Sequence, residues 1–574
     1  MNVDAYLAVA RGDREADLVL RGARVANVFT LEYEETDVAV YGGRIAGVGA
    51  GYRGVVEEDL SGLVLTPGFL DGHCHVESTM LTPAGFSELT AVRGTTGVAA
   101  DPHEIANTCG MAGVEYMWRE SLDCPIDLLF SAPSCVPASS FESPLEPLDA
   151  CAMLEMFDRG LCSSLGEVMN YPGVIGGDPA VWAKLYASGR RPRSGHAPGL
   201  IGRDLCAYLL SGCDSDHESF TLEEGREKLR RGMWLMIREG ATEKNLQELA
   251  PLVVENEARS SRCMMVSDDL SARYLRDCGH MDEKLRRAVE CGISPLAALR
   301  MITLSPADYF GWRDRGAVAP GRLADLVAVD SLETCRVRRV WKRGKLIAED
   351  GRLLGGPVPR SAPPAVSTST LPAPSERDFR ILVPQGMKIR VIGLKRDQVV
   401  TEHLVLPPTI RDGLAVTDPG RDLAWLAVME KNRGTGRMAV GFVQGLGLKE
   451  GAICSSVAHD AHNYIVAGMD ARSMRRAFAL LIELGGGIGA VRGDDVLASL
   501  SLPVGGLMNA SPADGVIDGF EEVERAALTL GTELEHPYMA LSFLSLSVIP
   551  ELKLTDQGYV DLGRGGIQSL FVGA

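Results

Sequence analysis

The sequence predicts an α/β protein organised around a (β/α)8 barrel. Apolar runs of four to seven residues alternate with amphipathic stretches such as residues 221–231 and 281–291, as expected for parallel strands covered by helices. Eight candidate strands fall in a segment of about 245 residues, the usual size of such a barrel. In chain order they read LVLTPGFL, TTGVAAD, IDLLFSA, LCSSLGE, RRPRSGHA, SGCDSDHE, WLMIREG and CMMVSDD.

Segments on both sides of the predicted barrel have the pattern of short antiparallel strands. Residues 16–65 alternate β-rich runs with glycine-containing turns, and a similar pattern returns at residues 316–349. We therefore expect residues 1–65 and 311–354 to form one small β-sandwich, with the barrel at residues 66–310.

The remaining chain divides into a linker and a further domain. Residues 355–376 are rich in Pro, Ser and Thr, which is typical of an exposed linker. Residues 377–574 mix strand-like runs with a clear helix over residues 470–484, so we expect a C-terminal α+β domain.

Charge and cysteine usage narrow the choice of partners and compartment. The net charge is -18, from 58 Lys plus Arg and 76 Asp plus Glu, and the basic residues form no long run, so neither nucleic acid nor an anionic membrane is expected as a partner. No run reaches the roughly 18 apolar residues of a membrane span, and the first twenty residues do not resemble a secretory signal. The 13 cysteines are scattered without a CxxC pair, which favours free thiols in the cytoplasm.

Two histidines, His73 and His75, follow the first candidate strand in PGFLDGHCHVEST, with Glu77 two residues later. Side chains alternate along a strand, so the two imidazoles point to one side. Imidazole nitrogen is a common ligand of zinc-like ions, so the pair indicates half of a metal site. Two polar loop histidines would show the same pattern, and the pair alone does not separate these interpretations.

Further candidate ligands stand at other strand ends. Glu167 ends the fourth candidate strand, His196 the fifth, His217 the sixth and Asp268 the eighth. Functional residues of (β/α)8 barrels collect at the carboxyl ends of the strands, so these side chains are expected to meet. With the histidine pair they supply ligands for two divalent ions about 3.5–4 Å apart, bridged by Glu167. Mn²⁺, Fe²⁺ and Zn²⁺ all accept such mixed ligands, so the sequence does not choose between them.

Other polar residues near the strand ends are expected to contact substrate or to orient the ligands. Asp101, His103 and Glu104 end the second candidate strand in ADPHEI. Asp269 either accepts a hydrogen bond from substrate or only solvates its loop. Arg238 ends the seventh strand, where an ion pair that stabilises the barrel mouth is the alternative.

A second histidine pair lies in the predicted C-terminal domain. His459 and His462, in HDAHN, are three residues apart, a spacing that would suit a metal if the segment were helical. We expect instead a structural role, or closure of this segment over the barrel mouth.

The motifs PGFLDGHCHVESTMLTP, GTTGVAADPHEIANTCG, GEVMNYPGVIGG, GHAPGL, DHES, LEEGREKLRRGMWLMIREG and VSDD occur in this order. With APGRLADLV, GLGLKEGAICSSVAHDAHNYIVAGMD and LSLSVIPELKLT, they make nearly the whole chain resemble bacterial adenine deaminases of the amidohydrolase superfamily. The resemblance implies an amidohydrolase-type barrel, adenine as substrate, and its hydrolytic deamination to hypoxanthine and ammonia at a binuclear metal centre. The chain departs from the family after the Asp-Asp pair, where it reads DDLSARYLRDCGHMD and lacks the usual Arg and Pro.

The ligands predict a mechanism. A metal-activated hydroxide attacks the purine carbon that carries the amino group. Asp268 accepts the hydroxide proton and passes it to the departing ammonia. For the acid that protonates the neighbouring ring nitrogen, we expect Glu77, on the same face as His75.

Two other functions compete with this interpretation. Cyclic-amide hydrolases of the same superfamily, such as hydantoinases and dihydroorotases, bridge their metals with a carbamylated lysine on strand four, whereas this strand ends in Glu167 and the next lysine is Lys184. A non-catalytic protein on a decayed barrel should have lost a ligand, and all six are present. We also expect a homo-oligomer that serves purine salvage.

Overall fold

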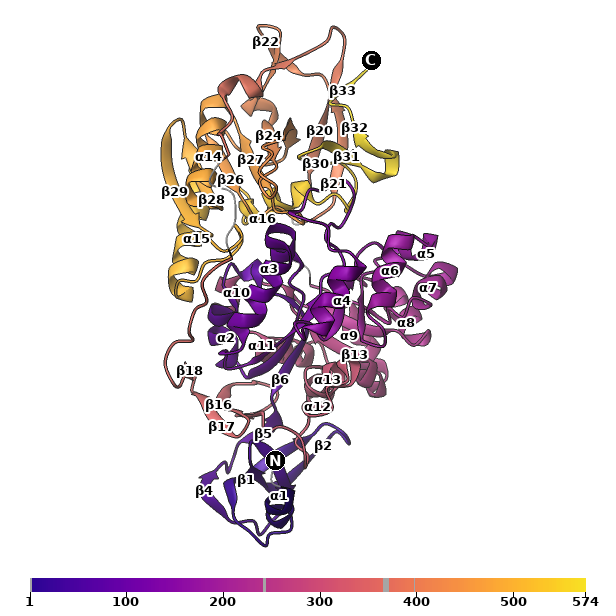
Figure 1. The fold of residues 1–574 in the computed structure, drawn as a ribbon, viewed down its shortest axis with the longest axis vertical. Coiled ribbons are helices and arrows are strands. Elements are labelled where there is room, and N and C mark those ends of the chain that lie inside the picture. Colours follow the sequence, from indigo (N-terminus) through magenta and orange to yellow (C-terminus); the bar gives the residue numbers. More distant parts are fainter. Residues whose placement is uncertain (1–2, 241–243, 365–370, 397, 574) are drawn as a thin grey trace.

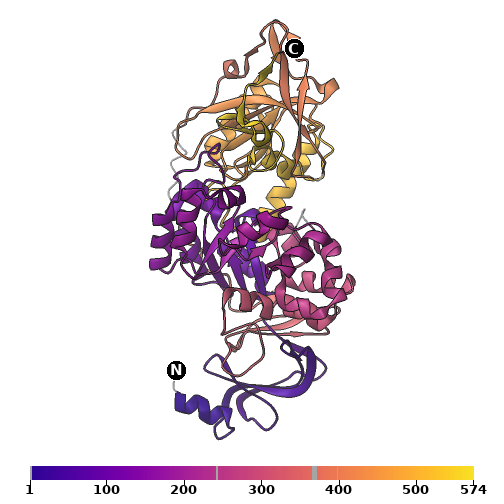
Figure 2. The ribbon, with the colours of Figure 1, turned by 90° about the vertical axis from the view of Figure 1, so that its right-hand side faces the viewer.

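A computed structural model describes residues 3–240, 244–364, 371–396 and 398–573. Three regions follow one another along the long axis of the molecule (Figures 1 and 2). The N-terminal strands lie at one end, the helix-rich part lies in the middle, and the C-terminal part lies at the other end. None of the described helices has the length and apolar character needed to cross a bilayer.

One sheet at the N-terminal end joins segments far apart in the sequence. Its order is β18-β17-β16-β15-β5-β1-β2-β3, with β4 beside β1, and β5 meets β15 in antiparallel register at Val64 and Val329. The described helix before it is α1 (Val3–Ala10). The strands are β1 (Ala16–Asn27), β2 (Glu32–Tyr41), β3 (Arg44–Val48), β4 (Gly54–Asp59), β5 (Val64–Pro67), β15 (Leu326–Val329), β16 (Val337–Lys342), β17 (Lys345–Glu349) and β18 (Arg352–Leu353).

The middle region is a curled parallel sheet in two hydrogen-bonded sections. The first has the order β10-β9-β8-β7-β6-β14 and the second β11-β12-β13. Where β10 meets β11, the N–H of Gly195 donates to Ser215 Oγ over 3.2 Å. The strands are β6 (Phe69–His75), β7 (Thr95–Ala100), β8 (Asp127–Ala132), β9 (Ser164–Val168), β10 (Arg193–Gly195), β11 (Ser215–Asp216), β12 (Trp234–Arg238), β13 (Cys263–Val266) and β14 (Asp268–Asp269).

The first parallel strand differs from the sequence prediction. The run LVLTPGFL is divided, because β5 belongs to the N-terminal sheet and β6 begins only at Phe69. His73 and His75 are therefore residues of the strand itself and do not follow it. Gly68 stands at the division, where an added Cβ would lie 2.2 Å from Thr96 Oγ1, so only glycine fits there.

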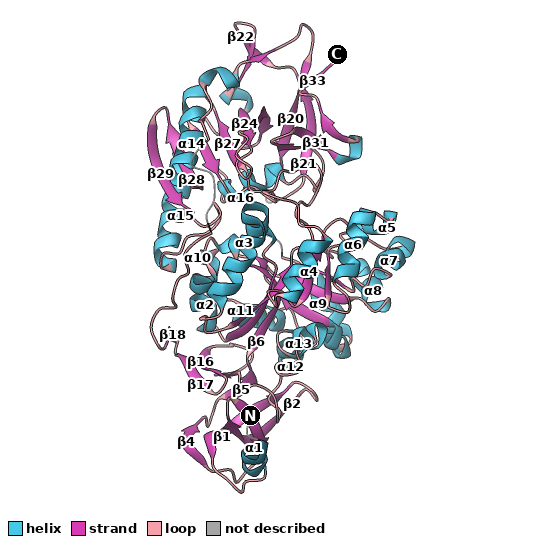
Figure 3. Cartoon of the chain, in the orientation of Figure 1, coloured by secondary structure: helices cyan, strands magenta, loops and turns pink. Residues whose placement is uncertain are grey.

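Helices cover the outside of the parallel strands (Figure 3). The predicted helix at 221–231 spans α8, where the Thr221 hydroxyl caps the first turn by accepting from Glu224 N–H. The helices are α2 (Pro83–Ala91), α3 (His103–Ser121), α4 (Ala150–Asp158), α5 (Tyr171–Gly176), α6 (Pro179–Ala187), α7 (Gly202–Leu209), α8 (Leu222–Arg230), α9 (Leu246–Glu255), α10 (Ala272–Asp277), α11 (Met281–Glu290), α12 (Pro295–Met301) and α13 (Leu304–Phe310).

The segment predicted as an exposed linker is partly docked. Arg360 forms an ion pair with Glu88 of α2 at 2.9 Å, and Ser361 N–H donates to Glu120 of α3 over 3.0 Å. Val358 is buried. Residues 365–370 of the predicted linker lie outside the described residues.

The C-terminal region is built on a mixed sheet of order β21-β20-β25-β24-β27-β26-β28-β29, with β33 beside β20. Helix α14 packs against it, and the Asp470 side chain caps that helix by accepting from Ser473 N–H. The elements are β19 (Ile381–Leu382), β20 (Lys388–Leu394), β21 (Thr401–Leu406), β22 (Thr409–Arg411), β23 (Leu414–Val416), β24 (Leu423–Met429), β25 (Met438–Gln444), β26 (Ala452–Ser455), β27 (Tyr464–Gly468), α14 (Ala471–Leu484), β28 (Gly487–Arg492), β29 (Asp495–Ser501), α15 (Ala513–Leu528), α16 (Pro537–Ser542), β30 (Lys553–Thr555), β31 (Gly558–Asp561), β32 (Gly566–Gln568) and β33 (Phe571–Val572).

The C-terminal region packs on the loops that follow the parallel strands. Asn432 donates to the carbonyl oxygen of Ser143 over 3.3 Å, and Ser139 and Ser547 share a hydrogen bond of 2.6 Å. Asn509 N–H donates to the carbonyl oxygen of Met80 over 2.8 Å. These contacts place C-terminal residues beside the carboxyl ends of the strands.

Candidate metal centre

The six predicted ligands meet at the carboxyl ends of the parallel strands. Each is at most 9% exposed. β14 pairs with β6 so that Asp268 lies opposite Cys74, between the two histidines of β6. The set is His73 and His75 on β6, Glu167 on β9, His196 directly after β10, His217 directly after β11, and Asp268 on β14.

The two carboxylate oxygens of Glu167 face different histidines. Oε1 lies 3.2 Å from His75 Nε2 and 3.8 Å from His73 Nε2. Oε2 lies 2.6 Å from His196 Nδ1 and 3.4 Å from His217 Nε2. A carboxylate held in this way can bind one ion through each oxygen.

The two carboxylate oxygens of Asp268, which lies beside β6, also face different partners. Its Oδ1 lies 3.3 Å from His73 Nε2 and 3.2 Å from His75 Nε2. Its Oδ2 accepts from Arg238 Nη1 over 2.8 Å. Burial raises the pKa of the carboxyl, but His73, His75 and Arg238 outweigh it and hold the pKa well below its usual range.

The residues present fit divalent ions. His75 Nδ1 lies 3.0 Å from the carbonyl oxygen of Asp101, which requires an N–H there and leaves Nε2 as a lone-pair ligand. His73 Nε2 is buried without a hydrogen-bond partner among the described residues. Ligand atoms of His73, His75 and Glu167, and those of Glu167, His196 and His217, each lie within 4.8 Å of one another. This nitrogen and oxygen set is that of zinc-like ions.

Asp101 lies behind the ligands. Its Oδ2 accepts from Glu167 N–H over 2.8 Å, while its backbone carbonyl holds His75. Burial and the neighbouring Glu167 carboxylate raise the pKa of Asp101 to about 7. Asp101 therefore orients ligands on both β6 and β9.

A cavity of about 90 Å³ opens beside the ligands. His103, Glu104, Asp269 and Arg238 line it. Glu218, which the sequence reasoning missed, also lines it and forms an ion pair of 2.5 Å with Arg238. Its position directly after His217 at a strand end was the available signal.

Glu77, the acid predicted from the sequence, lies close to the start of α3. Among the described residues that line the cavity, Glu104 is present and Glu77 is not. Glu77 Oε1 accepts from Ile105 N–H over 3.2 Å, next to Glu104 on α3. Burial raises the pKa of Glu77 to about 7, and burial together with Glu77 raises the pKa of Glu104 well above its usual range.

The second histidine pair lies against the same cavity. His459 lines it, and its Nδ1 is 3.8 Å from Glu104 Oε1. His462 is fully buried, with Nε2 at 3.8 Å from Glu104 Oε2. The N–H of Ala458 donates to His462 Nδ1 over 3.2 Å, which places the proton of a neutral imidazole on Nε2. Nε2 has no hydrogen-bond partner among the described residues, and ligand atoms of Glu104, His459 and His462 lie within 4.8 Å of one another.

Comparisons with known proteins identify the family of the chain. The Amidohydrolase family profile matches residues 64–347, and the Adenine deaminase C-terminal domain profile matches residues 398–565. An adenine deaminase of Desulfatibacillum aliphaticivorans is 43% identical over 571 residues, which are 99% of this chain and 99% of the relative. This chain belongs to the adenine deaminase family. Adenine deaminases of Methanothrix thermoacetophila and Methanoregula boonei are 41% and 44% identical to it, over 100% and 97% of this chain and 100% and 96% of the relatives.

Membership of the adenine deaminase family confirms the resemblance seen in the sequence motifs. The chain is accordingly an enzyme, a hydrolase with an amidohydrolase fold. The profile of the adenine deaminase C-terminal domain includes His459 and His462, which the structure places against the candidate metal centre.

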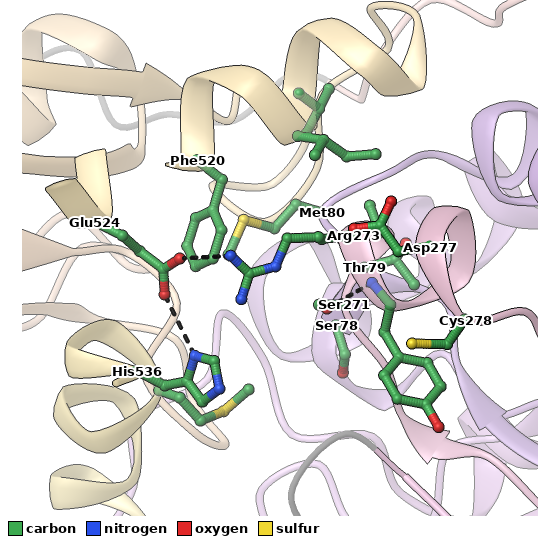
Figure 4. A pocket seen from close by; sticks show the side chains of 15 residues that line it. Ser78, Thr79, Met80, Ser271, Arg273, Asp277, Cys278, Phe520, Glu524 and His536 are labelled. Carbon is green, nitrogen blue, oxygen red and sulfur yellow. Dashed lines mark hydrogen bonds and ion pairs between the residues drawn. The ribbon is translucent and has the colours of Figure 1, made fainter. Parts of the chain in front are cut away.

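A second cavity of this adenine deaminase family member, about 250 Å³, lies between α10, α15 and α16 (Figure 4). In Figure 4 Arg273 faces Glu524, at 3.6 Å, and His536 lies on the other side of that carboxylate, at 3.5 Å. Ser78 also lines this cavity, and its hydroxyl hydrogen-bonds to Glu104 and Asp269 of the first cavity. Ser78 therefore stands between the two cavities.

Proposed function

We propose that this chain catalyses the hydrolytic deamination of adenine to hypoxanthine and ammonia. The orientation of Glu167, with each oxygen turned to a different set of histidines beside a small cavity, carries the proposal. The names of the relatives support adenine as the substrate. The compact cavity also suits a flat free base.

Two divalent ions, of Mn²⁺, Fe²⁺ or Zn²⁺, would be held by the six ligands. His73, His75, Glu167 and Asp268 would hold one ion, and Glu167, His196 and His217 would hold the other. When bound, such ions lower the pKa of a water toward neutrality.

Asp268 and the pair of Glu77 and Glu104 would carry out the proton transfers. Asp268 would take the proton of the attacking water and return it to the departing ammonia. Glu77, the acid expected from the sequence, would act together with Glu104, which faces the cavity. In this pair, Glu104 delivers the proton to the ring nitrogen, and Glu77 keeps it protonated.

The domain organisation we propose has the parallel strands closed into a complete (β/α)8 barrel. The link between Gly195 and Ser215 and the helices that follow the strands support closure. The barrel would occupy residues 68–310, because β5 lies in the N-terminal sheet. The small β-sandwich predicted from the flanking segments would be built on that sheet, from residues 3–67 and 311–354, and a C-terminal α+β domain would occupy residues 377–574.

We also propose a cytoplasmic homo-oligomer that acts in purine salvage without nucleic acid or membrane partners. The described cysteines are free thiols, which suits a reducing compartment. The acidic net charge supports the exclusion of polyanionic partners.

Purified protein reconstituted with Mn²⁺, Fe²⁺ or Zn²⁺ tests the proposal. With adenine it should release ammonia, and the purine absorbance should shift to that of hypoxanthine. The competing cyclic-amide hydrolase would instead open a hydantoin ring, although the amine of Lys184 donates to the Ser134 carbonyl oxygen and does not line the cavity. Inactivity on adenine with every metal, beside turnover of a hydantoin, would overturn the proposal.

A further inference from the structure

Part of the cavity beside the metal ligands is walled by residues of the C-terminal region. His459 and Asp460 come from the connection between β26 and β27, and Phe543 follows α16. The wall therefore comes from segments that lie about 190 to 275 residues beyond Asp268 in the sequence.

The side chain of Asp460 is buried beside the cavity. Its Oδ2 has no hydrogen-bond partner among the described residues, and the residue as a whole is only 3% exposed. Its Oδ1 lies 3.9 Å from His103 Nε2 and 3.8 Å from His459 Nδ1, which is beyond hydrogen-bond distance. Burial and the nearby Glu142 and Glu167 carboxylates raise the pKa of Asp460 well above its usual range. A buried carboxyl oxygen without a donor is costly in either protonation state, so a donor that enters the cavity is its natural partner.

The segment that carries Asp460 is fixed in place. His459 N–H donates to the carbonyl oxygen of Ser542 over 3.1 Å, and Ser545 Oγ donates to the His459 carbonyl oxygen over 3.0 Å. The His459 ring stacks on Phe543 with centroids 5.0 Å apart. Asp460 is thus presented to the cavity by a rigid support, which favours selective binding.

The imidazole of His103 shows where Asp460 stands relative to the metal ligands. Its Nδ1 lies 3.9 Å from Glu167 Oε1, and its Nε2 lies 3.9 Å from Asp460 Oδ1. The imidazole ring of His103, with one contact on each side, therefore separates the Asp460 carboxyl group from the Glu167 carboxylate. A bicyclic base with its amino-bearing carbon at the ligands would extend its other ring toward this carboxylate.

We propose that Asp460 accepts a hydrogen bond from the ring N–H of the purine, and so selects free bases over bases substituted at that nitrogen. This inference rests on the proposed deamination of adenine and assigns part of its specificity to the C-terminal region. A base that carries a methyl or sugar group on N9 has no N–H to offer and leaves the carboxylate unpaired, which is how polar sites reject analogues.

The test compares wild type with Asp460→Ala and Asp460→Asn. In the manganese-loaded enzymes, kcat/KM for adenine and the inhibition constant of 9-methyladenine are measured together with bound metal. Asp460→Ala should lower kcat/KM for adenine roughly 10- to 100-fold, the usual effect of losing the hydrogen-bond partner of a buried polar group. The inhibition constant of 9-methyladenine should stay the same or fall, because no unpaired carboxyl remains to reject it, and the metal content should not change. Asp460→Asn keeps an acceptor oxygen and should recover part of the loss.

Asp561→Asn is the matched control, because Asp561 is a buried carboxylate of the same region, bound to His403 at 2.5 Å and away from the cavity. It should leave both constants unchanged. Equal weakening of adenine and 9-methyladenine by Asp460→Ala, no effect on either, or loss of metal would overturn the assignment. Absence of ammonia release by the wild type would instead refute the proposed reaction itself.

Discussion

Arg238 Nη1 lies 2.8 Å from Asp268 Oδ2, while the other oxygen of Asp268 faces His73 and His75. The guanidinium thus holds the carboxylate in a rotation that presents Oδ1 to the metal site. Glu218 holds Arg238 in turn, at 2.5 Å. The orientation of the proposed proton acceptor therefore depends on a charged pair at the cavity wall.

Replacing Arg238 should lower turnover. Arg238→Met removes a charged hydrogen bond to Asp268, so we expect kcat to fall roughly 10- to 100-fold. Arg238→Lys keeps the charge and should lose less. Steady-state kinetics with ammonia detection measures both. A kcat for Arg238→Met within twofold of wild type would contradict this role.

Removing His217 should reduce the bound metal. His217→Ala deletes a ligand near Glu167 Oε2, and we expect fewer than two ions per chain by elemental analysis. His403→Ala, which removes a buried histidine outside the cavity, should keep two ions. Equal metal content in the two variants would show that His217 is not a ligand.

The roles of Glu104 and Glu77 can be separated by amide substitutions. Glu104→Gln should lower kcat strongly, on the order of 100-fold or more, because general acid catalysis contributes at that scale. Glu77→Gln should have a smaller effect, through Glu104. Glu120→Gln, a buried carboxyl on the same helix but outside the cavity, serves as control. A normal kcat for Glu104→Gln beside a large loss for Glu77→Gln would make Glu77 the proton donor. A normal kcat for both variants would show that neither residue donates the proton.

Lys228 should be important for stability. Its buried amine lies 2.8 Å from Asp216 and 2.7 Å from Glu224. Lys228→Met leaves the Asp216 and Glu224 carboxylates without their lysine partner. The free energy of unfolding, measured by urea denaturation, should therefore fall by about 3–5 kcal/mol. A change below about 1 kcal/mol, the range of surface pairs, would contradict this.

The ion pairs of Lys228 also predict how the stability of the protein changes in acid. Burial raises the pKa of Asp216, but Lys228 outweighs it and lowers the pKa well below the usual value. A carboxyl with a lowered folded pKa contributes stability that is present above its unfolded pKa, about 4, and is lost as the pH falls. The stability difference between wild type and Lys228→Met should therefore shrink below about pH 4. A difference that grows on acidification would refute this assignment.

Lys553 should make stability depend on pH in the alkaline range. Burial lowers its pKa to about 7, although its amine donates to the carbonyl oxygens of Val399 and Phe543. Between pH 7 and about 10, the unfolded chain binds the proton that the folded chain has lost, so wild type gains up to about 1.4 kcal/mol per pH unit. Relative to Lys553→Met, wild type should become more stable as the pH rises over this range in urea unfolding. A flat difference would show that Lys553 keeps an ordinary pKa.

The ligands of the candidate metal centre could be recognised from the sequence because general rules locate them. Strand alternation places His73 and His75 on one side, and parallel strands bring Glu167 and Asp268 to the same edge. The sequence predicts the first strand at the wrong place because LVLTPGFL is one largely apolar run. Periodicity does not show where one apolar strand ends and the next begins, and here the break depends on a close contact at Gly68.

Other parts of the cavity had no local signal. Asp460 reaches it only through contacts between regions far apart in the chain, and sequence patterns mark local structure, not such contacts. Glu77 and Glu104 illustrate a second limit. Both are acidic residues near strand ends, but the turn after β6 and the start of α3 decide which carboxyl faces the cavity.

The pairing of β5 with β15 bears on how the chain is made. β5 leaves the ribosome about 260 residues before its partner strand. At the usual speed of synthesis, roughly 5–20 residues per second, the N-terminal strands wait on the order of tens of seconds with an apolar edge uncovered. During that interval the nascent chain is exposed to aggregation, and chaperones that shield strand edges should raise the yield of active enzyme.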